Sequence, residues 1–128
     1  MIRLPPYGEA LGIEPIRDEH SRLVLKLPFG NHVSGRPGFL HGGAIAGLLE
    51  IAGIMSLYDQ LGEDDRPQVK PITVTTDFMR NGFPKMTYAA GIITRSGRRM
   101  ANVESFAWQD DESKPIAASR MNLLLVRK

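Results

Sequence analysis

Apolar residues gather in one long run in the first half of the chain and alternate with polar residues in the second half. The run reads HGGAIAGLLEIAGIM over residues 41–55, and after its histidine and two glycines eleven of twelve residues are apolar or glycine. Its length, alanines and leucines predict a helix that ends near Leu61-Gly62. Because almost no polar face remains, we expect this helix to be covered on nearly all sides. Glu50 is the one charged residue inside it.

The rest of the pattern predicts strands. Residues 22–27, RLVLKL, place three leucines on one face, and a loop rich in glycine and proline follows over 28–40. After the helix, alternating and β-branched segments predict four more strands, over 72–79, 87–95, 99–108 and 115–127. This order predicts an α+β domain, in which a curved antiparallel β-sheet wraps around a central α-helix and a second subunit covers the remainder.

Composition and charge narrow the class of protein. The 128 residues correspond to one ordinary domain, and the lack of cysteine excludes a disulfide scaffold and fits a reducing compartment. Basic residues are spread along the chain with a formal net charge of +2, whereas a nucleic-acid-binding protein usually carries a strong basic face. The first residues lack the apolar core of a signal peptide, and the long run is marginally short for a membrane span. We therefore expect a soluble cytoplasmic protein without nucleic-acid or membrane partners.

Glu50 has two interpretations. It lies at the rim of the helix and reaches solvent or an ion-pair partner, or it lies at the edge of an enclosed pocket. Burial in a pocket disfavours the charged form of a carboxylate and suits it for base catalysis. Because a buried unpaired carboxylate is costly, a chain that retains one usually needs it for function.

The start of the helix supports the second interpretation. A helix N-terminus presents unpaired N–H groups, and glycine lets a ligand approach the backbone closely. The N–H of Gly42 or Gly43 is therefore a candidate to polarise a carbonyl oxygen. Glu50 lies roughly 12 Å further along an ideal helix, too far for one substrate atom to touch both within one chain. This distance favours a site shared across a dimer.

One motif resembles the signature of hotdog-fold acyl-CoA thioesterases. It consists of His41-Gly42-Gly43, six further residues and then Glu50. The pattern is most similar to the phenylacetate-degradation (PaaI-like) branch. TVTTDFMRNGFP resembles that branch's strand ending in an arginine and a turn, and ITRSGRRMANVESFAW resembles its hairpin. The resemblance covers roughly residues 22–126 and implies a single hotdog domain over 1–128. It also implies a homodimer or homotetramer whose substrate is an acyl-CoA, with no cofactor because coenzyme A is part of the substrate.

The resemblance also implies a role for each site residue. Glu50 activates water as general base or attacks the thioester itself, the Gly42 N–H polarises the carbonyl, and His41 helps to orient the thioester. Arg80 is the best-aligned candidate to hold the phosphates of coenzyme A. The hairpin supplies the next candidates for that role, although a solvated turn explains them equally well: Arg95, Ser96, Gly97, Arg98 and Arg99. No metal is implied, because one histidine near one glutamate lacks the usual ligand count.

One position departs from the family pattern. Related enzymes often carry asparagine or glutamine six residues before the histidine, where this chain has Gly35. Asn31 or His32 would have to take that role through a rearranged loop, and Asn31 is the candidate. A serine or threonine on the strand after the helix assists in some members. Thr73 and Thr75 are available for it, although Pro71 obscures the register.

Two alternatives remain open. The first is a hotdog dehydratase or enoyl hydratase, since NHVSGRPGFL followed by LLE resembles the loop histidine and helix glutamate of that family, with His32 as the histidine. The second is a non-catalytic acyl-CoA-binding protein, which has the same fold. The acyl group is not readable, and a pocket for it is expected among apolar side chains: Phe39, Leu40, Met55, Tyr58 and Phe78.

Overall fold

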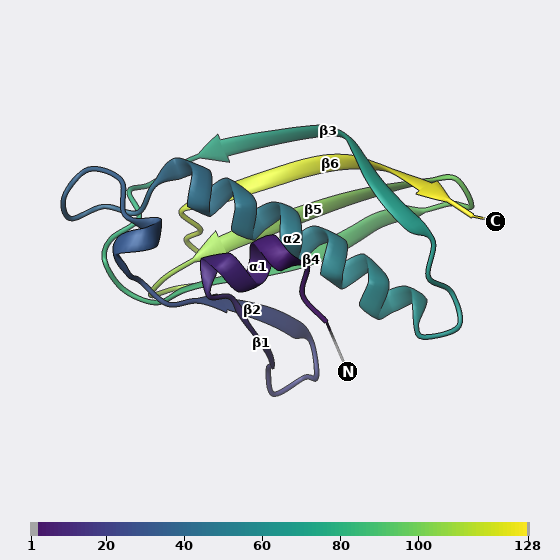
Figure 1. Ribbon diagram of the computed structural model, residues 1–128, viewed down its shortest axis with the longest axis horizontal. Coiled ribbons are helices and arrows are strands. Elements are labelled where there is room, and N and C mark those ends of the chain that lie inside the picture. The colour runs from purple at the N-terminus through teal and green to yellow at the C-terminus, as the bar shows by residue number, and fades with distance from the viewer. Residues whose placement is uncertain (1–2, 128) are drawn as a thin grey trace.

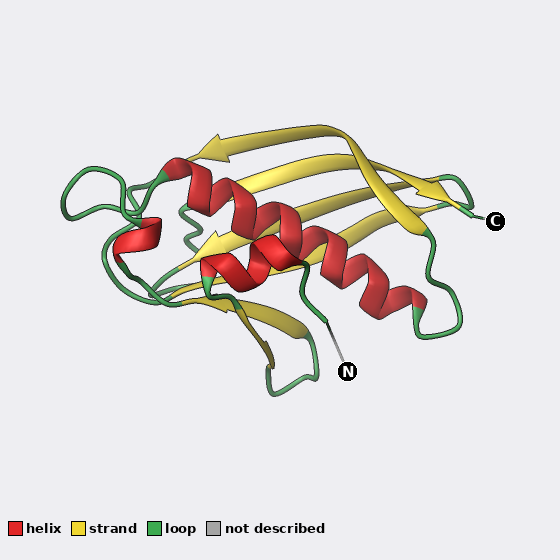
Figure 2. Ribbon diagram, viewed as in Figure 1, coloured by secondary structure: helices red, strands yellow, loops and turns green. Residues whose placement is uncertain are grey.

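The computed structural model describes residues 3–127 as a six-stranded antiparallel sheet with one long helix along one face (Figures 1 and 2). The helix is α2, Gly42–Leu61. The strands are β1 Glu14–Arg17, β2 Leu23–Leu27, β3 Gln68–Phe78, β4 Thr87–Ser96, β5 Met100–Trp108 and β6 Ala117–Val126. Their order in the sheet is β1-β2-β4-β5-β6-β3, with antiparallel pairing throughout. The predicted sheet around a central helix is confirmed.

Alternation along the strands places the core between the sheet and α2. In β6 the residues between the buried positions are wholly or partly exposed, and the buried positions are Ala117, Ser119, Met121, Leu123 and Leu125. Helix and sheet approach closely at Gly53, where an added Cβ would lie 2.7 Å from the Met121 methyl group. Close packing of this kind supplies most of the helix's stability.

The exposure of α2 shows which side the sheet covers. By length and composition alone α2 could cross a membrane, but 56% of its apolar window is buried inside the protein. The partly exposed positions of the helix, including Gly47, Glu50 and Ile54, follow one face turned away from the sheet. Within one chain the helix is thus a core helix with one face left partly open.

Three short elements were not predicted from the sequence, and the strand β3 begins earlier than expected. The short helix α1, Pro6–Leu11, and strand β1 precede the first predicted strand, and the 3-10 helix Asn31–Val33 follows it. Strand β3 begins at Gln68 rather than Ile72, so that Pro71 lies inside it. An edge strand tolerates proline because one side of it has no hydrogen-bonding neighbour. The register shifts between Pro71 and Thr73, which leaves Ile72 as an extra residue.

Strand β3 is an open edge of the sheet. It pairs only with β6, and apart from Val69 and Thr76 its residues are exposed on both faces. Large apolar side chains are among them, with Ile72 60% and Phe78 55% exposed. Unpaired backbone groups and exposed apolar side chains on one edge strand form a surface suited to pairing with another chain.

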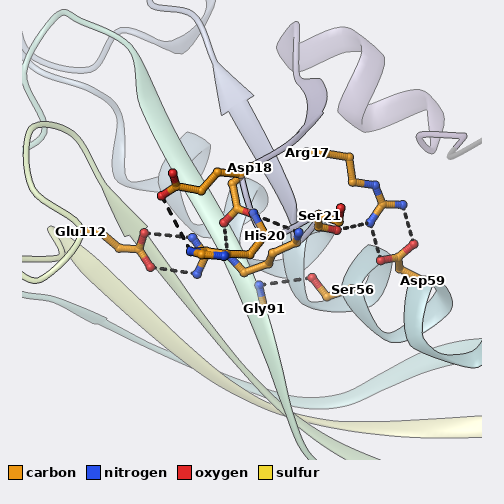
Figure 3. A network of polar contacts seen from close by, with 10 residues as sticks. Arg17, Asp18, His20, Ser21, Ser56, Asp59, Gly91 and Glu112 are labelled. Atoms are coloured by element: carbon orange, nitrogen blue, oxygen red, sulfur yellow. Dashed lines mark hydrogen bonds and ion pairs between the residues drawn. The ribbon is translucent and has the colours of Figure 1, made fainter.

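A polar network fastens the β1–β2 hairpin to the rest of the protein (Figure 3). Arg17 donates two hydrogen bonds of 2.7 Å to the Asp59 carboxylate at the end of α2. Arg22 contacts Glu112 through two bonds of 2.8 and 2.9 Å and also Asp18 at 3.0 Å. The hydrogen bonds from these arginines lower the pKa of Asp59 and of Glu112. We call Arg17, Asp18, Arg22, Asp59 and Glu112 the hairpin network.

Candidate active site

A cavity of about 300 Å³ opens at the start of α2. Its walls come from the loop before the helix, the first turn of the helix and the turn after β3. The lining residues are Gly35, Arg36, Phe39, Leu40, His41, Gly42, Ile45, Phe78, Arg80, Asn81 and Gly82. The structure therefore brings together three residues that the sequence predicted for one site, His41, Gly42 and Arg80.

His41 is the N-cap of α2. Its Nδ1 accepts a hydrogen bond of 2.8 Å from the Gly43 N–H, and its backbone is extended at φ −70° and ψ 135°. A nitrogen that accepts a hydrogen bond carries a lone pair, so we infer that the neutral ring has its proton on Nε2. The cap thus fixes the tautomer and leaves Nε2–H as a donor at the cavity.

The two glycines of the motif differ in their hydrogen bonding. The Gly43 N–H is used by the cap, whereas the Gly42 N–H meets no acceptor among residues 3–127. Gly42 also lies against Phe78, because an added Cβ would be 3.6 Å from the ring. Between the two candidates named by the sequence, Gly42 is the one whose N–H is free to bind a ligand, and the helix dipole favours negative charge there.

Backbone hydrogen bonds hold the turn after β3 against the start of α2. Leu40 donates its N–H to the Gly82 carbonyl at 2.9 Å, and Arg80 donates its N–H to the Ile116 carbonyl at 3.0 Å. A side chain at Gly82 would meet Leu40 at 3.0 Å, so glycine is what permits this approach. These contacts hold Arg80 at the cavity.

Two arginines line the cavity without an ion-pair partner in residues 3–127, although the pKa of Asp111, lowered chiefly by hydrogen bonds, is lowered also by the charge of Arg80. The Arg80 guanidinium has only a long contact of 3.5 Å to the Pro115 carbonyl, and the Arg36 guanidinium lies 4.5 Å from the centre of the Phe39 ring. Neither forms an ion pair within the described residues. The cavity thus combines apolar walls with cationic groups and a free N–H, a combination suited to an acyl group and negative charge.

Glu50 does not line this cavity. It is half-buried on the open face of α2 and forms no hydrogen bond or ion pair inside residues 3–127. The ion-pair partner that its rim interpretation allowed is therefore not found in the described part of the chain. Glu50 and Gly42 lie on the same continuous helix, as expected from the sequence.

The arginine-rich hairpin lies at the other end of the molecule. Figure 1 shows the β4–β5 turn beside the C-terminus, at the end of the sheet away from the start of α2. Arg99 accepts a bond from the Leu125 N–H, and the Arg98 carbonyl accepts one from Arg127. Within one chain the structure does not bring Arg95, Arg98 or Arg99 to His41, nor the Ser96 and Gly97 between them.

Thr73 and Thr75 also lie away from the cavity. They pair with Asn122 and Arg120, which are the exposed positions of β6, so they point to the outer face of the sheet. The inner positions of β3 are Val74, Thr76 and Phe78, which pair with buried residues of β6. The Thr76 hydroxyl is 2.8 Å from the Ser119 hydroxyl.

The polar residues proposed to replace the amide missing at Gly35 are not at the cavity either. Asn31 is an exposed residue of a short 3-10 helix, Asn31–Val33, and does not line the cavity. The His32 ring nitrogen Nε2 lies 2.9 Å from the Leu11 carbonyl. Gly35 is in such close contact that an added Cβ would be 3.0 Å from the His41 Cα.

The expected apolar pocket is confirmed in part. Three of the five expected residues line the cavity: Phe39, Leu40 and Phe78. Met55 is instead buried in the core. Tyr58 lies toward the other end of α2, where its hydroxyl donates to the Pro67 carbonyl. Sequence reasoning missed Arg36, Asn81 and Gly82 as lining residues. The sequence indicates these three residues only through their closeness to the motifs already recognised. Among residues 3–127 no cluster of three metal-ligating side chains occurs.

Comparisons with known proteins agree on the family. The model of the thioesterase superfamily matches residues 37–116, more than half of the chain. A Bacillus halodurans protein solved with CoA has a TM-score of 0.85 at 22% identity, covering 97% of this chain and 80% of its own. A Chromobacterium violaceum protein is 36% identical with a TM-score of 0.74, over 95% and 84% of the two chains.

A third structure is a phenylacetic acid degradation-related protein from Ralstonia eutropha JMP134. It has a TM-score of 0.80 at 18% identity and covers 96% of this chain and 92% of its own. No curated protein sequence matches the chain. With the family model covering α2 and strands β3, β4 and β5, the chain belongs to the thioesterase superfamily and has the hotdog fold.

Proposed function

We propose that this protein hydrolyses an acyl-CoA thioester to the free acid and coenzyme A. The observation that carries the proposal is the free N–H of Gly42 in a cavity that also holds His41 and Arg80. Membership of the superfamily supports thioesterase activity in general. The coenzyme A in the Bacillus halodurans structure supports this class of substrate.

In the proposed reaction the thioester carbonyl oxygen accepts a hydrogen bond from the Gly42 N–H. This donor is already oriented, so it stabilises the negative charge that develops as the carbonyl carbon is attacked. As general base, Glu50 takes a proton from the attacking water; as nucleophile, it forms an acyl-enzyme that water then hydrolyses. In either case the C–S bond breaks and coenzyme A leaves as a thiolate.

The site we propose is shared between two protomers. Glu50 and Gly42 are separated along one helix, and β3 has an unpaired edge with exposed Ile72 and Phe78. Antiparallel pairing of β3 with its copy about a two-fold axis would continue the sheet and cover these side chains. The open face of α2 that carries Glu50 would then meet the partner protomer, in a dimer or in a tetramer built from two dimers.

This arrangement also gives the hairpin arginines a role. In a chain, the hairpin and the first residues of β3 lie at the same end of the sheet, since Gln68 pairs with Val126 and Leu125 contacts Arg99. Antiparallel β3 pairing places that end of one protomer near the α2 start of the other. Arg80 of one protomer and the hairpin arginines of the other would then flank one coenzyme A, where guanidinium groups bind phosphate well.

The dehydratase alternative needs a free loop histidine. His32 is the candidate, but its ring is held at 2.9 Å from the Leu11 carbonyl, and the turn before it packs against the ring at Gly30. A histidine fixed in this way serves the fold, so hydrolysis is favoured over hydration. Activity measurements separate hydrolysis from simple acyl-CoA binding.

The test is thiol release from a panel of aromatic, short, medium and long acyl-CoAs, read with a disulfide reagent. Wild type is compared with Glu50→Gln, and Asp59→Asn is the matched control because it also removes a carboxylate from α2. We expect wild type to release coenzyme A from some substrates. Glu50→Gln should lose about 10²-fold or more in rate, the size of a lost general base, with its melting temperature retained.

Three results would contradict the proposal: no thiol release by wild type from any member of the panel, full activity in Glu50→Gln, or an equal loss in Asp59→Asn. Enoyl-CoA hydration and plain acyl-CoA binding, measured on the same protein, would then identify which alternative holds.

A further inference from the structure

One carboxamide lines the cavity at the start of α2, and the reaction described above does not use it. Asn81 follows Arg80 in the turn after β3. It is the only asparagine or glutamine among the lining residues. Its side chain is exposed and forms no hydrogen bond within residues 3–127. An amide with free donors that lines the same cavity as the free Gly42 N–H is a second candidate to bind the same oxygen.

The backbone around Asn81 is fixed on both sides. Before it, the Arg80 N–H is bound to the Ile116 carbonyl at 3.0 Å; after it, the Gly82 carbonyl accepts from Leu40 at 2.9 Å. Leu40 directly precedes His41, so this hydrogen bond ties the turn to the start of the helix. Because the backbone is already fixed, only the Asn81 side chain itself loses conformational entropy when substrate binds.

No other amide near the motif is as well placed. Asn31 is outside the cavity lining, and the 3-10 helix that carries it is tied through His32 to Leu11, on the side of α1. Gly35 has no side chain, and its contact with His41 leaves no room for one in this loop conformation.

We infer that Asn81 is a substrate-contacting residue whose Nδ2–H donates to the thioester carbonyl oxygen, together with the Gly42 N–H. This inference rests on the proposed function. As water or Glu50 attacks, the new C–O bond forms, and the carbonyl oxygen gains the negative charge that both donors stabilise. When the C–S bond breaks, the electron pair leaves with sulfur. In the general-base route the proton taken from water neutralises the thiolate; in the nucleophilic route the thiolate takes its proton from solvent, and water then hydrolyses the acyl-enzyme to the free acid. Two donors on one oxygen are the usual composition of an oxyanion hole.

Asn81 also borders a second hollow of about 240 Å³, which Gln109 and Asp110 line as well. If its amide faced that hollow during catalysis, it would contact a part of the substrate away from the reacting carbonyl, or none at all. The kinetic constants distinguish these cases, because a contact made only in the transition state changes kcat and a uniform contact changes KM.

The experiment compares Asn81→Ala and Asn81→Asp with Asn31→Ala, and uses Asn122→Ala as a control that removes an amide from the outer sheet face. We expect Asn81→Ala to lower kcat by about 10²- to 10³-fold with KM little changed, the effect of one lost oxyanion donor. Asn81→Asp should be lower still, because a carboxylate of the same shape repels the oxyanion. Asn31→Ala should lose less than Asn81→Ala, and all variants should keep the wild-type melting temperature.

The inference is overturned if Asn81→Ala keeps its kcat, if only KM changes, if Asn81→Asp exceeds Asn81→Ala in rate, or if Asn31→Ala loses more. A merely structural role would lower the melting temperature and would not give this order of the two substitutions. If wild type itself releases no thiol, the proposed function fails and the inference fails with it. An active wild type with an unaffected Asn81→Ala rejects the inference alone.

Discussion

At the hairpin network each arginine meets a carboxylate, whereas at the start of α2 Arg36 and Arg80 meet none. Arg17 forms a bidentate hydrogen-bonded ion pair with Asp59, and Arg22 forms one with Glu112, at distances of 2.7 to 2.9 Å. At the helix start, by contrast, the Gly42 N–H has no acceptor among the described residues, and the two guanidinium groups form no ion pair there, with only a 3.5 Å contact from Arg80 to the Pro115 carbonyl. Apolar side chains, Phe78 among them, also stay exposed there.

The difference separates groups that are bonded within the fold from groups that remain free to bind a ligand. Arginines that have satisfied partners inside the chain add a little stability and have no capacity left for a substrate. Donors that have no partner gain one when an electron-rich group binds. The same reasoning applies to Glu50, which shares a helix with Asp59 but lacks the arginine that Asp59 has.

The largest expected effect comes from removing the Gly42 N–H. Gly42 is the first residue of α2, where proline is well tolerated, and the extended His41 backbone suits a residue before proline. Gly42→Pro should therefore fold normally and lose about 10²- to 10³-fold in kcat, because one oxyanion donor is gone. Steady-state kinetics and a thermal melt measure both quantities.

Gly42→Ala is the matched control for that substitution. It retains the N–H, and its Cβ would lie at an ordinary distance of 3.6 Å from the Phe78 ring. It should keep most of the activity that Gly42→Pro loses. Equal losses in the two variants would show that space, not the donor, is what Gly42 provides.

A middle-sized effect is expected at His41, where one ring serves both the fold and the site. His41→Ala loses the cap and should cost about 1 kcal/mol in the free energy of unfolding. His41→Asn keeps a good cap and should retain wild-type stability. Both lose the Nε2–H, so both should lose about tenfold in kcat/KM, the size of one ordinary hydrogen bond. Full activity in His41→Asn would limit His41 to its role as a cap.

The smallest effect is expected in the hairpin network. Arg17 holds the pKa of Asp59 below its ordinary value of 3.8, so their pairing adds stability at neutral pH and loses it as the pH falls through the folded pKa. The two side chains are 45% and 32% exposed, so Asp59→Asn should cost no more than about 1 kcal/mol at pH 7. Urea unfolding at pH 7 and near pH 3 should show the difference between wild type and variant shrinking in acid. A difference that grows in acid would contradict the assigned direction.

The sequence predicted the elements whose pattern is long and regular. The bounds of α2 follow from its apolar run, and β4, β5 and β6 follow from alternation. By contrast, α1 and β1 are too short for a period to show. The signal for α1 was local, since Pro6 opens it and Gly12, at φ 79°, ends it. The predicted start of β3, at Ile72, is too late. Proline is unusual inside a strand, and the sequence does not reveal that β3 is an edge strand, where proline is tolerated.

The site was predicted where its residues are neighbours in sequence and missed where they are not. His41 and Gly42 belong to one motif, and the free N–H of Gly42 follows once the cap is seen. Asn81 reaches the cavity through the contact between Leu40 and Gly82, which are distant in sequence. Thr73 and Thr75 were named as candidates without a register, and the irregularity at Ile72, which the sequence does not reveal, turns them to the outer face of the sheet.

The most direct test of the central claim, a site built from Gly42 of one protomer and Glu50 of the other, is a mixture of two inactive variants. Gly42→Pro and Glu50→Gln chains are produced separately, then mixed under conditions that exchange subunits, and thiol release is measured. In a shared site each hybrid dimer contains one intact pair, so random exchange should restore about a quarter of the wild-type activity. A mixture that stays as inactive as its parents, with hybrid dimers confirmed to be present, would contradict the shared site.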